Sequence, residues 1–450
     1  MSGLREFIGR LEEKGKLVRV KDEVSVRFEA AAIIKEFERE KAIYFEKIKE
    51  SNFHVVAGLC GSRERLCMAL NLASTDKLYE KILEALKNPT KPQIVSDGEV
   101  KEVLEKPNLE KFPILTHYEK EKPYITSAVV SAKSPDGKIE NVSVHRFQVL
   151  GRDKLAIRIV PRHLYRLCRM AEEAGEKTLK IAVSIGVHPA VILAAASPAP
   201  FGLNEYWIAN TLLNGKLKLT RCEKVDLNVP ADAEIVFEGE IVLDELVEEG
   251  PLADLTQTYD AVRLQPVVRL LGVMRRENCV YHALLPAGFE HRIFMGLFRE
   301  AKIWDSVRNV VPTVKAVRLT DGGCGWLHAV ISIKKQLEGD GKNAILAAFA
   351  GHPSLKHVVV VDEDIDIENP FEVEWALATR FQGDKDMVVV KGVRGSTLDP
   401  SANQETGETT KVGFDATKSL SKPAEKFERV SIPENEKVKG LVRKLRESFG

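Results

Sequence analysis

The chain has 450 residues, 44% hydrophobic and 29% charged, a composition that predicts a folded protein of roughly two to four domains. Its 66 Lys and Arg balance its 66 Asp and Glu, so it lacks the basic surplus expected of a nucleic-acid-binding protein. The sequence shows no signal peptide and no apolar run of roughly 18 residues, and its six cysteines form no CxxC pair, which favours a cytoplasmic protein without a zinc ribbon.

The first 110 residues are expected to form an N-terminal α/β domain, because helix and strand patterns alternate there. Leu4, Phe7, Ile8 and Leu11 lie at helical spacing, and a strand is predicted at 17–20. The further elements predicted in this domain are helices at 28–38 and 76–87 and strands at 42–48 and 53–59. Residues 88–114, which are rich in Pro, Lys and Glu, are expected to form a loop.

Residues 111–300 are expected to form a central β-rich domain, either a barrel or a sandwich. Short β-type runs bounded by Gly, Asp and Asn recur through this region. They cover residues 127–134, 141–151, 154–160, 180–187, 233–243 and 267–276. Two helix-like runs, at 164–176 and 205–213, interrupt the strands.

Residues 301–430 return to an alternating pattern and are expected to form a C-terminal α/β domain. Its structured runs cover residues 303–311, 326–335, 342–350 and 357–367. In the tail, residues 431–450, apolar residues recur at helical spacing; they are Val438, Leu441, Val442, Leu445 and Phe449. Such a stripe predicts a terminal helix that docks on its own chain or on a neighbouring copy.

Two Gly-rich or acid-rich stretches have simple structural explanations. DGGCGW, residues 321–326, lacks the strand–Gly–helix context of a phosphate-binding loop and is predicted to be a turn. DEDID, residues 362–366, lacks the glycine and the distal glutamate of a calcium loop and is predicted to be a solvated strand end. Walker A and GxGxxG patterns are absent from the sequence.

NVSVHRFQV, residues 141–149, places a charge on an otherwise apolar strand face. Alternation along a strand puts Asn141, Ser143, His145 and Phe147 on one face and Val142, Val144 and Arg146 on the other. An arginine among valines needs an anionic partner, and a salt bridge across the sheet is the simplest one. The functional alternative is a guanidinium positioned for a carboxylate or a phosphate, which its fork suits.

Three further motifs carry acids or a histidine. His163 follows a strand and a proline, where a structural hydrogen bond would explain it, and Glu205 lies near a helix start, where the helix dipole favours an acid. In EEGPLAD, the Gly-Pro turn brings Glu249 and Asp254 toward each other. Two adjacent carboxylates raise one pKa above its usual value of about 4 and allow acid–base chemistry near neutrality, although a solvated loop also explains the motif.

Taken in this order and spacing, the motifs resemble the UbiD-like decarboxylase family, which uses prenylated FMN. The stretches that carry the resemblance are Asn141–Arg146, PRH ending at His163, SPAPFGLNE ending at Glu205, EEGPLAD, and residues 229–241, 361–367 and 411–419. The resemblance implies an N-terminal α/β domain, a central flavin-binding split β-barrel, and a C-terminal α/β domain ending in a helix that reaches a neighbouring subunit. A homo-oligomer, dimer or hexamer, is therefore expected.

The resemblance also implies the site residues. Asn141, His163 and Glu205 match ligands of Mn²⁺ or Mg²⁺, which bridges to the cofactor phosphate, and Ala195–Ser197 matches a region that often binds K⁺. The positions matching the flavin-binding residues are Val144, His145, Arg146, Arg158, Ile159, Val160, His163 and Ser197. Arg146, Glu249 and Asp254 match the catalytic network, with Asp254 as the proton donor and Glu249 as its partner. A lysine that some fungal relatives use near the cofactor phosphate has no match, since Ala350 stands there.

The implied reaction is the loss of CO₂ from an α,β-unsaturated acid. Prenylated FMN, supplied by a flavin prenyltransferase, takes up the electrons, and a protein acid protonates the carbon. Resemblance to the archaeal branch of the family implies trans-anhydromevalonate 5-phosphate as substrate and isopentenyl phosphate as product, in a mevalonate pathway. The alternative substrate is a 4-hydroxybenzoate-type aryl acid of quinone biosynthesis. Two other functional classes are considered. One is a non-catalytic flavin carrier, which the presence of Arg146, Glu249 and Asp254 disfavours, and the other is a hydrolase that uses paired carboxylates and needs no flavin.

Overall fold

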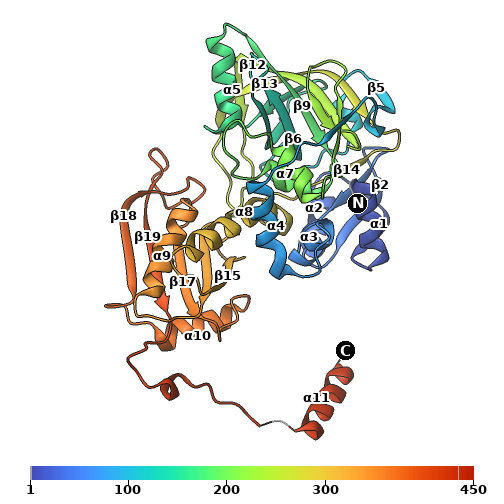
Figure 1. Cartoon of the computed structure of the whole chain (residues 1–450). Coiled ribbons are helices and arrows are strands. Elements are labelled where there is room, and N and C mark those ends of the chain that lie inside the picture. Colours follow the sequence, from blue (N-terminus) through green and yellow to red (C-terminus); the bar gives the residue numbers. More distant parts are fainter. Residues whose placement is uncertain (1–2, 434, 450) are drawn as a thin grey trace.

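A computed structural model describes residues 3–433 and 435–449 of the chain. Figure 1 shows an N-terminal α/β unit, a β-barrel beside it, a C-terminal α/β unit, and a last helix that stands apart from all three. The expected α/β class with a central β-barrel is confirmed. The exact domain limits, at 110, 300 and 430, stay predictions.

The N-terminal unit is built on a four-stranded sheet in the order β1-β2-β3-β14. Its elements are α1 (Leu4–Glu13), β1 (Leu17–Val24), α2 (Glu29–Phe37), β2 (Ala42–Ile48), β3 (His54–Ala57), α3 (Arg63–Ala69), α4 (Leu78–Lys87) and β14 (Val280–His282). The predicted apolar face of α1 is buried, and Gly15, at φ 64°, lets the chain turn into β1. Because β14 follows the barrel in sequence, its pairing with β3 ties the barrel back to the first unit.

Six strands of the central unit close into a ring, in the order β12-β9-β6-β7-β8-β13, with β13 pairing back to β12. The strands are β6 (Tyr124–Lys133), β7 (Glu140–Val149), β8 (Lys154–Ile157), β9 (Thr178–Ile185), β12 (Ile235–Glu249) and β13 (Arg263–Arg275). Three helices lie between them in sequence: α5 (His163–Glu173), α6 (Pro189–Ala195) and α7 (Glu205–Leu212). The strands share one hydrophobic core, in which Val130, Ile181, Phe237 and Val268 are completely buried. Closure of the ring removes the sheet edges that would otherwise need cover.

Residues 88–114 differ from the expected loop. They contain β4 (Gln93–Val95), β5 (Val103–Glu105) and two single turns of 3-10 helix, at Glu99–Lys101 and Leu109–Lys111. β13 extends past its partner β8, and β5 pairs with the edge that is left open there. β4 pairs with β10 (Lys218–Arg221), which also pairs with β11 (Asn228–Pro230). Strands of three residues are too short to leave a periodic signal in the sequence.

The C-terminal unit is a five-stranded sheet in the order β15-β16-β17-β19-β18. Its elements are α8 (Phe289–Arg308), β15 (Val314–Leu319), β16 (His328–Ile333), α9 (Asp340–Gly351), β17 (His357–Asp362), α10 (Pro370–Arg380), β18 (Met387–Arg394) and β19 (Glu408–Ala416). DGGCGW forms a turn, as predicted. The DEDID stretch is less solvated than predicted, because Asp362 and Asp364 pair with the buried guanidinium of Arg380 at 2.7 and 2.8 Å.

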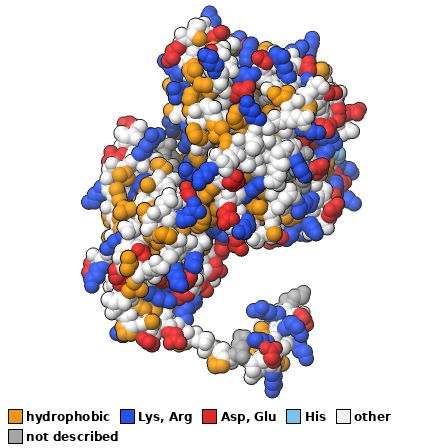
Figure 2. Space-filling view, in the orientation of Figure 1, with side chains coloured by type: hydrophobic (Ala, Val, Ile, Leu, Met, Phe, Trp, Pro, Cys, Tyr) orange, Lys and Arg blue, Asp and Glu red, His pale blue; other side chains and the backbone are white. Residues whose placement is uncertain are grey.

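The tail ends in α11 (Glu436–Phe449), which stands apart from the rest of the chain (Figures 1 and 2). The predicted stripe is open to solvent, with Leu441 51% and Leu445 56% exposed. Gly450 and the side chain of Phe449 lie outside the described part of the chain. None of the helices in the described residues is both long and apolar enough to cross a membrane.

Candidate active site

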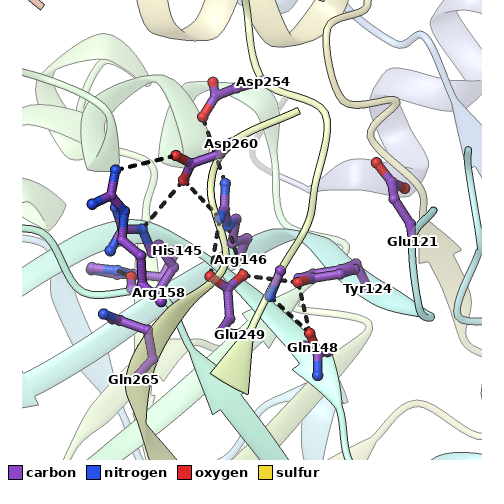
Figure 3. A network of polar contacts seen from close by, with 12 residues as sticks. Glu121, Tyr124, His145, Arg146, Gln148, Arg158, Glu249, Asp254, Asp260 and Gln265 are labelled. Carbon is purple, nitrogen blue, oxygen red and sulfur yellow. Dashed lines mark hydrogen bonds and ion pairs between the residues drawn. The ribbon is translucent and has the colours of Figure 1, made fainter. Parts of the chain in front are cut away.

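Arg146 joins the middle of β7 to the end of β12 (Figure 3). Its Nε and Nη2 donate to Oε1 and Oε2 of Glu249 at 2.8 and 3.0 Å. Glu249 is completely buried, whereas its neighbour Glu248 is exposed. The Tyr124 hydroxyl lies 2.9 Å from Glu249 Oε1 and 2.9 Å from Gln148 Oε1. Arg146 therefore has the anionic partner that its place on an apolar strand face requires.

The loop between β12 and β13 brings two more carboxylates to the same arginine. Asp254 Oδ2 lies 3.6 Å from Arg146 Nη1, and the Asp254 side chain is 22% exposed. Asp260 Oδ2 accepts a hydrogen bond from Arg146 Nη2 at 2.9 Å and lies 3.5 Å from Arg158 Nε. Glu249 and Asp254 thus meet at one guanidinium, which is the convergence that the Gly-Pro turn predicted.

Burial and charge act in opposite directions on the arginines of this network. Burial alone would lower the pKa of Arg146, but its hydrogen bonds to Glu249 and the charge of Glu249 raise it above its ordinary value. Burial lowers the pKa of Arg158, and the charge of Asp260 opposes that change. Burial and the charge of Glu249 raise the pKa of Tyr124. The tyrosine hydroxyl therefore keeps its proton at neutral pH and stays a hydrogen-bond donor.

The loop that carries Asp254 is fastened on both sides of that residue. Glu121 Oε1 accepts a hydrogen bond from the backbone N–H of Ala253 at 2.7 Å. The ammonium group of Lys120 lies 5.3 Å from the centre of the Tyr259 ring, and Ala253 pairs with Tyr259 across the loop. The segment just before β6 therefore sets where the Asp254 carboxyl group stands.

A second polar group lies at the start of β7. Oε2 of Glu205, the first residue of α7, accepts from the Val142 N–H at 2.7 Å, and its Oε1 lies 3.6 Å from His163 Nδ1. Asn141 is 2% exposed, and its buried Oδ1 has no hydrogen-bond partner among the described residues. Burial raises the pKa of Glu205, while its hydrogen bonds with His163 and Val142 oppose that change.

These donors fit a divalent metal ion. A buried amide oxygen without a partner, a buried carboxylate and an imidazole nitrogen are ligands that a hard or borderline cation accepts. No cluster of three or more His, Cys, Asp or Glu suited to a metal occurs in the described residues. The third possible donor is the amide oxygen of Asn141, and the assignment of Asn141, His163 and Glu205 as metal ligands stays a prediction.

Hydrogen bonds along β7 link the two polar groups. Ser143 Oγ lies 2.8 Å from Asn141 Nδ2 and 2.9 Å from His145 Nε2. His145 Nδ1 lies 3.0 Å from the carbonyl oxygen of Arg158. Burial lowers the pKa of His145 to about 4, so its ring is neutral at physiological pH. The alternation predicted for the strand thus holds, with Asn141, Ser143 and His145 on one face.

The other residues expected to line the flavin flank this chain of hydrogen bonds. Val144 is half-buried, and Val160 is 41% exposed. The Ile159 N–H donates to Gln265 Oε1 at 2.7 Å. Within the described residues, the buried Ser197 Oγ has no hydrogen-bond partner, so it offers an unused hydroxyl in the 195–197 segment that is expected to bind K⁺.

The sequence did not predict four residues of this network: Glu121, Tyr124, Gln148 and Asp260. Gln148 shares the strand face of Arg146, so alternation along β7 was a sufficient signal for it. Tyr124 stands opposite Gln148 in the β6–β7 register, which one sequence does not reveal. Asp260 lies in an irregular loop, where no periodicity applies.

Three family models match consecutive parts of the chain. They describe the N-terminal, Rift-related and C-terminal domains of the 3-octaprenyl-4-hydroxybenzoate carboxy-lyase UbiD and match residues 8–86, 93–289 and 292–416. Among curated relatives, the anhydromevalonate phosphate decarboxylase of Methanothermobacter thermautotrophicus is 50% identical over 434 residues, 96% of this chain and 100% of that protein. The protein of the same name from Methanocaldococcus jannaschii is 44% identical over 437 residues, with 96% and 100% coverage.

Solved structures are similar over nearly the full length. The UbiD-class enzyme HmfF from Pelotomaculum thermopropionicum, in complex with FMN, superposes with a TM-score of 0.92 at 46% identity, covering 96% of this chain and 97% of that one. Apo 3,4-dihydroxybenzoic acid decarboxylase (AroY) from Klebsiella pneumoniae gives a TM-score of 0.91 at 26% identity, with 97% and 98% coverage. Consecutive family matches and this identity over whole chains confirm the predicted family: the chain belongs to the UbiD family of carboxy-lyases.

Proposed function

We propose that the protein decarboxylates trans-anhydromevalonate 5-phosphate to isopentenyl phosphate and CO₂ with prenylated FMN, in an archaeal-type mevalonate pathway. The observation that carries the chemistry is the convergence of Glu249 and Asp254 on Arg146. The substrate rests on relatives of that name, at 44% to 50% identity over most of the chain. The cofactor rests on the UbiD-class enzyme HmfF, whose structures contain FMN and prFMN.

In this proposal Arg146 steers the substrate carboxylate and Asp254 supplies the proton. The contact of Arg146 Nη1 with Asp254 is 3.6 Å, longer than a hydrogen bond, so this arm of the fork is the one that a substrate carboxylate can occupy. Bound prenylated FMN supplies the electron-accepting chemistry of the reaction. As the bond to the carboxyl carbon breaks, Asp254 gives its proton to the carbon that lost CO₂. Asp254 then regains a proton from water, to which its side chain is open.

We assign the flavin to the face of β7 and the segment after β8. The residues concerned are Val144, His145, Arg146, Arg158, Ile159, Val160, His163 and Ser197. Asn141, His163 and Glu205 would hold Mn²⁺ or Mg²⁺ at the cofactor phosphate, and Ala195–Ser197 would contribute to a K⁺ site. The unpartnered buried atoms Asn141 Oδ1 and Ser197 Oγ support this assignment, because buried polar atoms normally have partners.

The test is turnover by protein co-expressed with a flavin prenyltransferase, the proposed supplier of the cofactor. Loaded wild-type protein should release CO₂ and isopentenyl phosphate. Asp254→Asn should abolish turnover and retain the flavin spectrum, whereas Glu248→Gln, an exposed control next to the site, should change neither. Absence of isopentenyl phosphate from loaded wild-type protein contradicts the substrate, and full activity of Asp254→Asn contradicts its role.

An aryl-acid decarboxylase is the second candidate. The observation in its favour is the similarity to 3,4-dihydroxybenzoic acid decarboxylases, with TM-scores of 0.91 and 0.90. The same loaded protein should then consume 4-hydroxybenzoate-type acids and leave anhydromevalonate phosphate unchanged. Running both substrates side by side separates the two candidates in one assay.

We also propose that the protein is a cytoplasmic homo-oligomer in which α11 docks on a neighbouring copy. The exposed apolar stripe of the helix supports this, because a stripe of this kind is normally covered. HmfF has an evolved dimeric form, so assembly differs even within one UbiD-class enzyme. Removal of residues 431–450 should lower the number of subunits in the assembly, measured as its mass by light scattering. An unchanged number of subunits contradicts the role of α11.

A further inference from the structure

A cavity of about 200 Å³ lies where the N-terminal unit, α8 and the C-terminal unit meet, a junction that Figure 1 shows. One wall is a single face of α8, on which Phe289, Ile293 and Leu297 recur every four residues. The facing walls come from residues 61–63 of the N-terminal unit and from residues 319 and 321 of the C-terminal unit. Among the described residues, the lining shares no member with the acid network around Arg146 or with the proposed metal set. The cavity is therefore separate from the candidate active site.

The Gly-rich turn at residues 321–326 closes one side of this cavity. A Cβ atom on Gly296 of α8 would lie 2.6 Å from the Gly325 carbonyl oxygen, and a Cβ atom on Gly325 would lie 2.9 Å from Arg292 Cβ. Glycine at both positions therefore lets the turn pack directly on α8, and Gly325 also has a positive φ of 64°. The close approach brings the carbonyl oxygen of Asp321 to 3.2 Å from Arg292 Nη1. The glycines of DGGCGW thus shape the cavity.

Arg292, which lines the cavity, is a buried cation whose hydrogen-bonding capacity is mostly unused. It is 7% exposed. Within residues 3–433 and 435–449 it forms no ion pair, its Nη1 donates to Asp321, and its buried Nε has no acceptor. Most N–H groups of its guanidinium thus have no acceptor among the described residues. A buried charge with unmet donors is costly, so Arg292 calls for an anion in the cavity.

The acids near Arg292 are already engaged elsewhere. Three ion pairs account for the other charged residues of the lining: Arg63 with Glu300 at 2.5 Å, Arg39 with Asp321 at 3.4 Å, and Arg318 with Glu368. Behind the cavity, the oxygens of Glu38 accept from the backbone N–H groups of Phe289 and Glu290 at 2.7 and 3.4 Å. One positive charge of the lining, that of Arg292, is therefore left without a paired carboxylate.

The remainder of the lining suits an apolar body. The side chains of Ile293, Leu297 and Leu319 contribute apolar surface. The guanidinium carbons of Arg39 and Arg292 lie 5.0 and 5.4 Å from the centre of the Phe289 ring, which fixes both cations beside an aromatic face. Engineered cavities of about 150 Å³ admit benzene, so a molecule somewhat larger than benzene fits here.

We propose that this cavity is a second binding site, which takes a small carboxylic acid with an apolar body. The single negative charge of the ligand balances Arg292, and a carboxylate accepts parallel hydrogen bonds from a guanidinium fork. A phosphate monoester carries about two negative charges at neutral pH and would meet only one uncompensated cation. The apolar body packs on Ile293, Leu297 and Leu319. Because the walls belong to the N-terminal and C-terminal units, the bound acid links these two units.

4-Bromobenzoate is the probe, because anomalous diffraction locates its bromine atom. In soaked crystals of the full-length protein loaded with FMN, the bromine should lie beside Leu297 and the carboxylate beside Arg292. Calorimetric titration should give a Kd for this site roughly ten- to a hundredfold higher for Arg292→Gln than for wild type. Arg292→Lys, which keeps the buried charge and loses the fork, should give an intermediate Kd. Arg308→Gln, on the same helix but outside the cavity and paired with Asp305 at 2.7 Å, is the matched control and should bind like wild type.

The neutral analogue 4-bromobenzamide tests the role of charge, because it has nearly the same shape. Bromine in the cavity, weaker binding by Arg292→Gln and weaker binding of the amide together support the proposal. Equal affinity of wild type and Arg292→Gln, or equal affinity for the acid and the amide, overturns it. A bromine signal without saturable binding in solution shows binding at crystal concentration only and also overturns it. Bromine at Arg146 alone overturns the second site and favours the aryl-acid candidate for the active site.

Discussion

Replacing Tyr124 by Phe isolates one contact of the buried acid. The tyrosine is 1% exposed, and its hydroxyl lies 2.9 Å from Glu249 Oε1 and from Gln148 Oε1. The substitution removes one oxygen and leaves the ring packing in place, so it creates almost no cavity. Glu249 then keeps only its two contacts from Arg146, at 2.8 and 3.0 Å. We expect its carboxylate to be held less firmly beside Arg146.

The size of the effect follows from the charge of the acceptor. A hydrogen bond to a charged group contributes about 1.5–3 kcal/mol, which corresponds to roughly ten- to a hundredfold in a rate constant when the whole of it is lost in the transition state. Because two contacts from Arg146 remain, we expect the lower end, a fall of about tenfold in kcat with little change in KM. The melting temperature should also fall, since Glu249 is buried.

Tyr79→Phe is the matched control for this experiment. Tyr79 is 9% exposed, and its hydroxyl donates to the buried carboxylate of Glu300 at 3.0 Å. Glu300 lies on α8 and is not part of the acid network around Arg146. It should lower the melting temperature and leave kcat unchanged. Steady-state kinetics of loaded enzyme and thermal melts of all three proteins give the comparison. If Tyr124→Phe has the kcat of wild type, or if Tyr79→Phe loses as much activity, the tyrosine does not act through Glu249.

Three further perturbations test other parts of the structure. Asp260→Asn should lower kcat roughly tenfold, because Arg146 loses a charge-assisted contact that orients its fork, and Asp260→Glu should restore most of it in the same assay. Glu205→Gln should weaken Mn²⁺ binding at least tenfold by metal analysis after dialysis, since a neutral amide is a poorer ligand for a hard cation, and equal metal content would exclude Glu205 as a ligand. Burial raises the pKa of Glu38 to about 7, so its stabilising contribution is fully present below its unfolded pKa of about 4.5 and is lost as the pH rises through 7. Between pH 5 and pH 8 the free energy of unfolding of the wild type should therefore fall by up to about 3 kcal/mol relative to that of Glu38→Gln. A difference in unfolding free energy that does not change with pH would contradict this.

The sequence predicted the parts of the site that lie on regular elements. Alternation along 141–149 placed Asn141 and His145 on the face opposite Arg146, and the structure has them so. The same rule failed for Tyr124, because its contact with Gln148 depends on the β6–β7 register, and the partner of a strand is a property of the whole fold. Asp260 shares a loop with Asp254, yet without a period nothing in the sequence says which loop acids turn inward. Long-range pairing and irregular backbone were thus the two sources of error.

The surroundings of the two predicted acids differ enough to give them different tasks. Both oxygens of Glu249 are occupied, by Arg146 and by the Tyr124 hydroxyl, and no solvent reaches it. A proton on Glu249 would have to displace one of those donors and would have no path back from water. The Asp254 carboxyl group accepts from the Leu255 N–H at 2.7 Å through Oδ1 and contacts Arg146 at 3.6 Å through Oδ2. Its side chain is 22% exposed, so it can exchange its proton with solvent after each turnover. Its position is fixed through the backbone of Ala253 by Glu121. A proton donor must be reprotonated from solvent after each turnover and must keep its orientation toward the substrate. A solvent-accessible carboxyl group on a hydrogen-bonded backbone meets both needs, which is why we place the proton on Asp254.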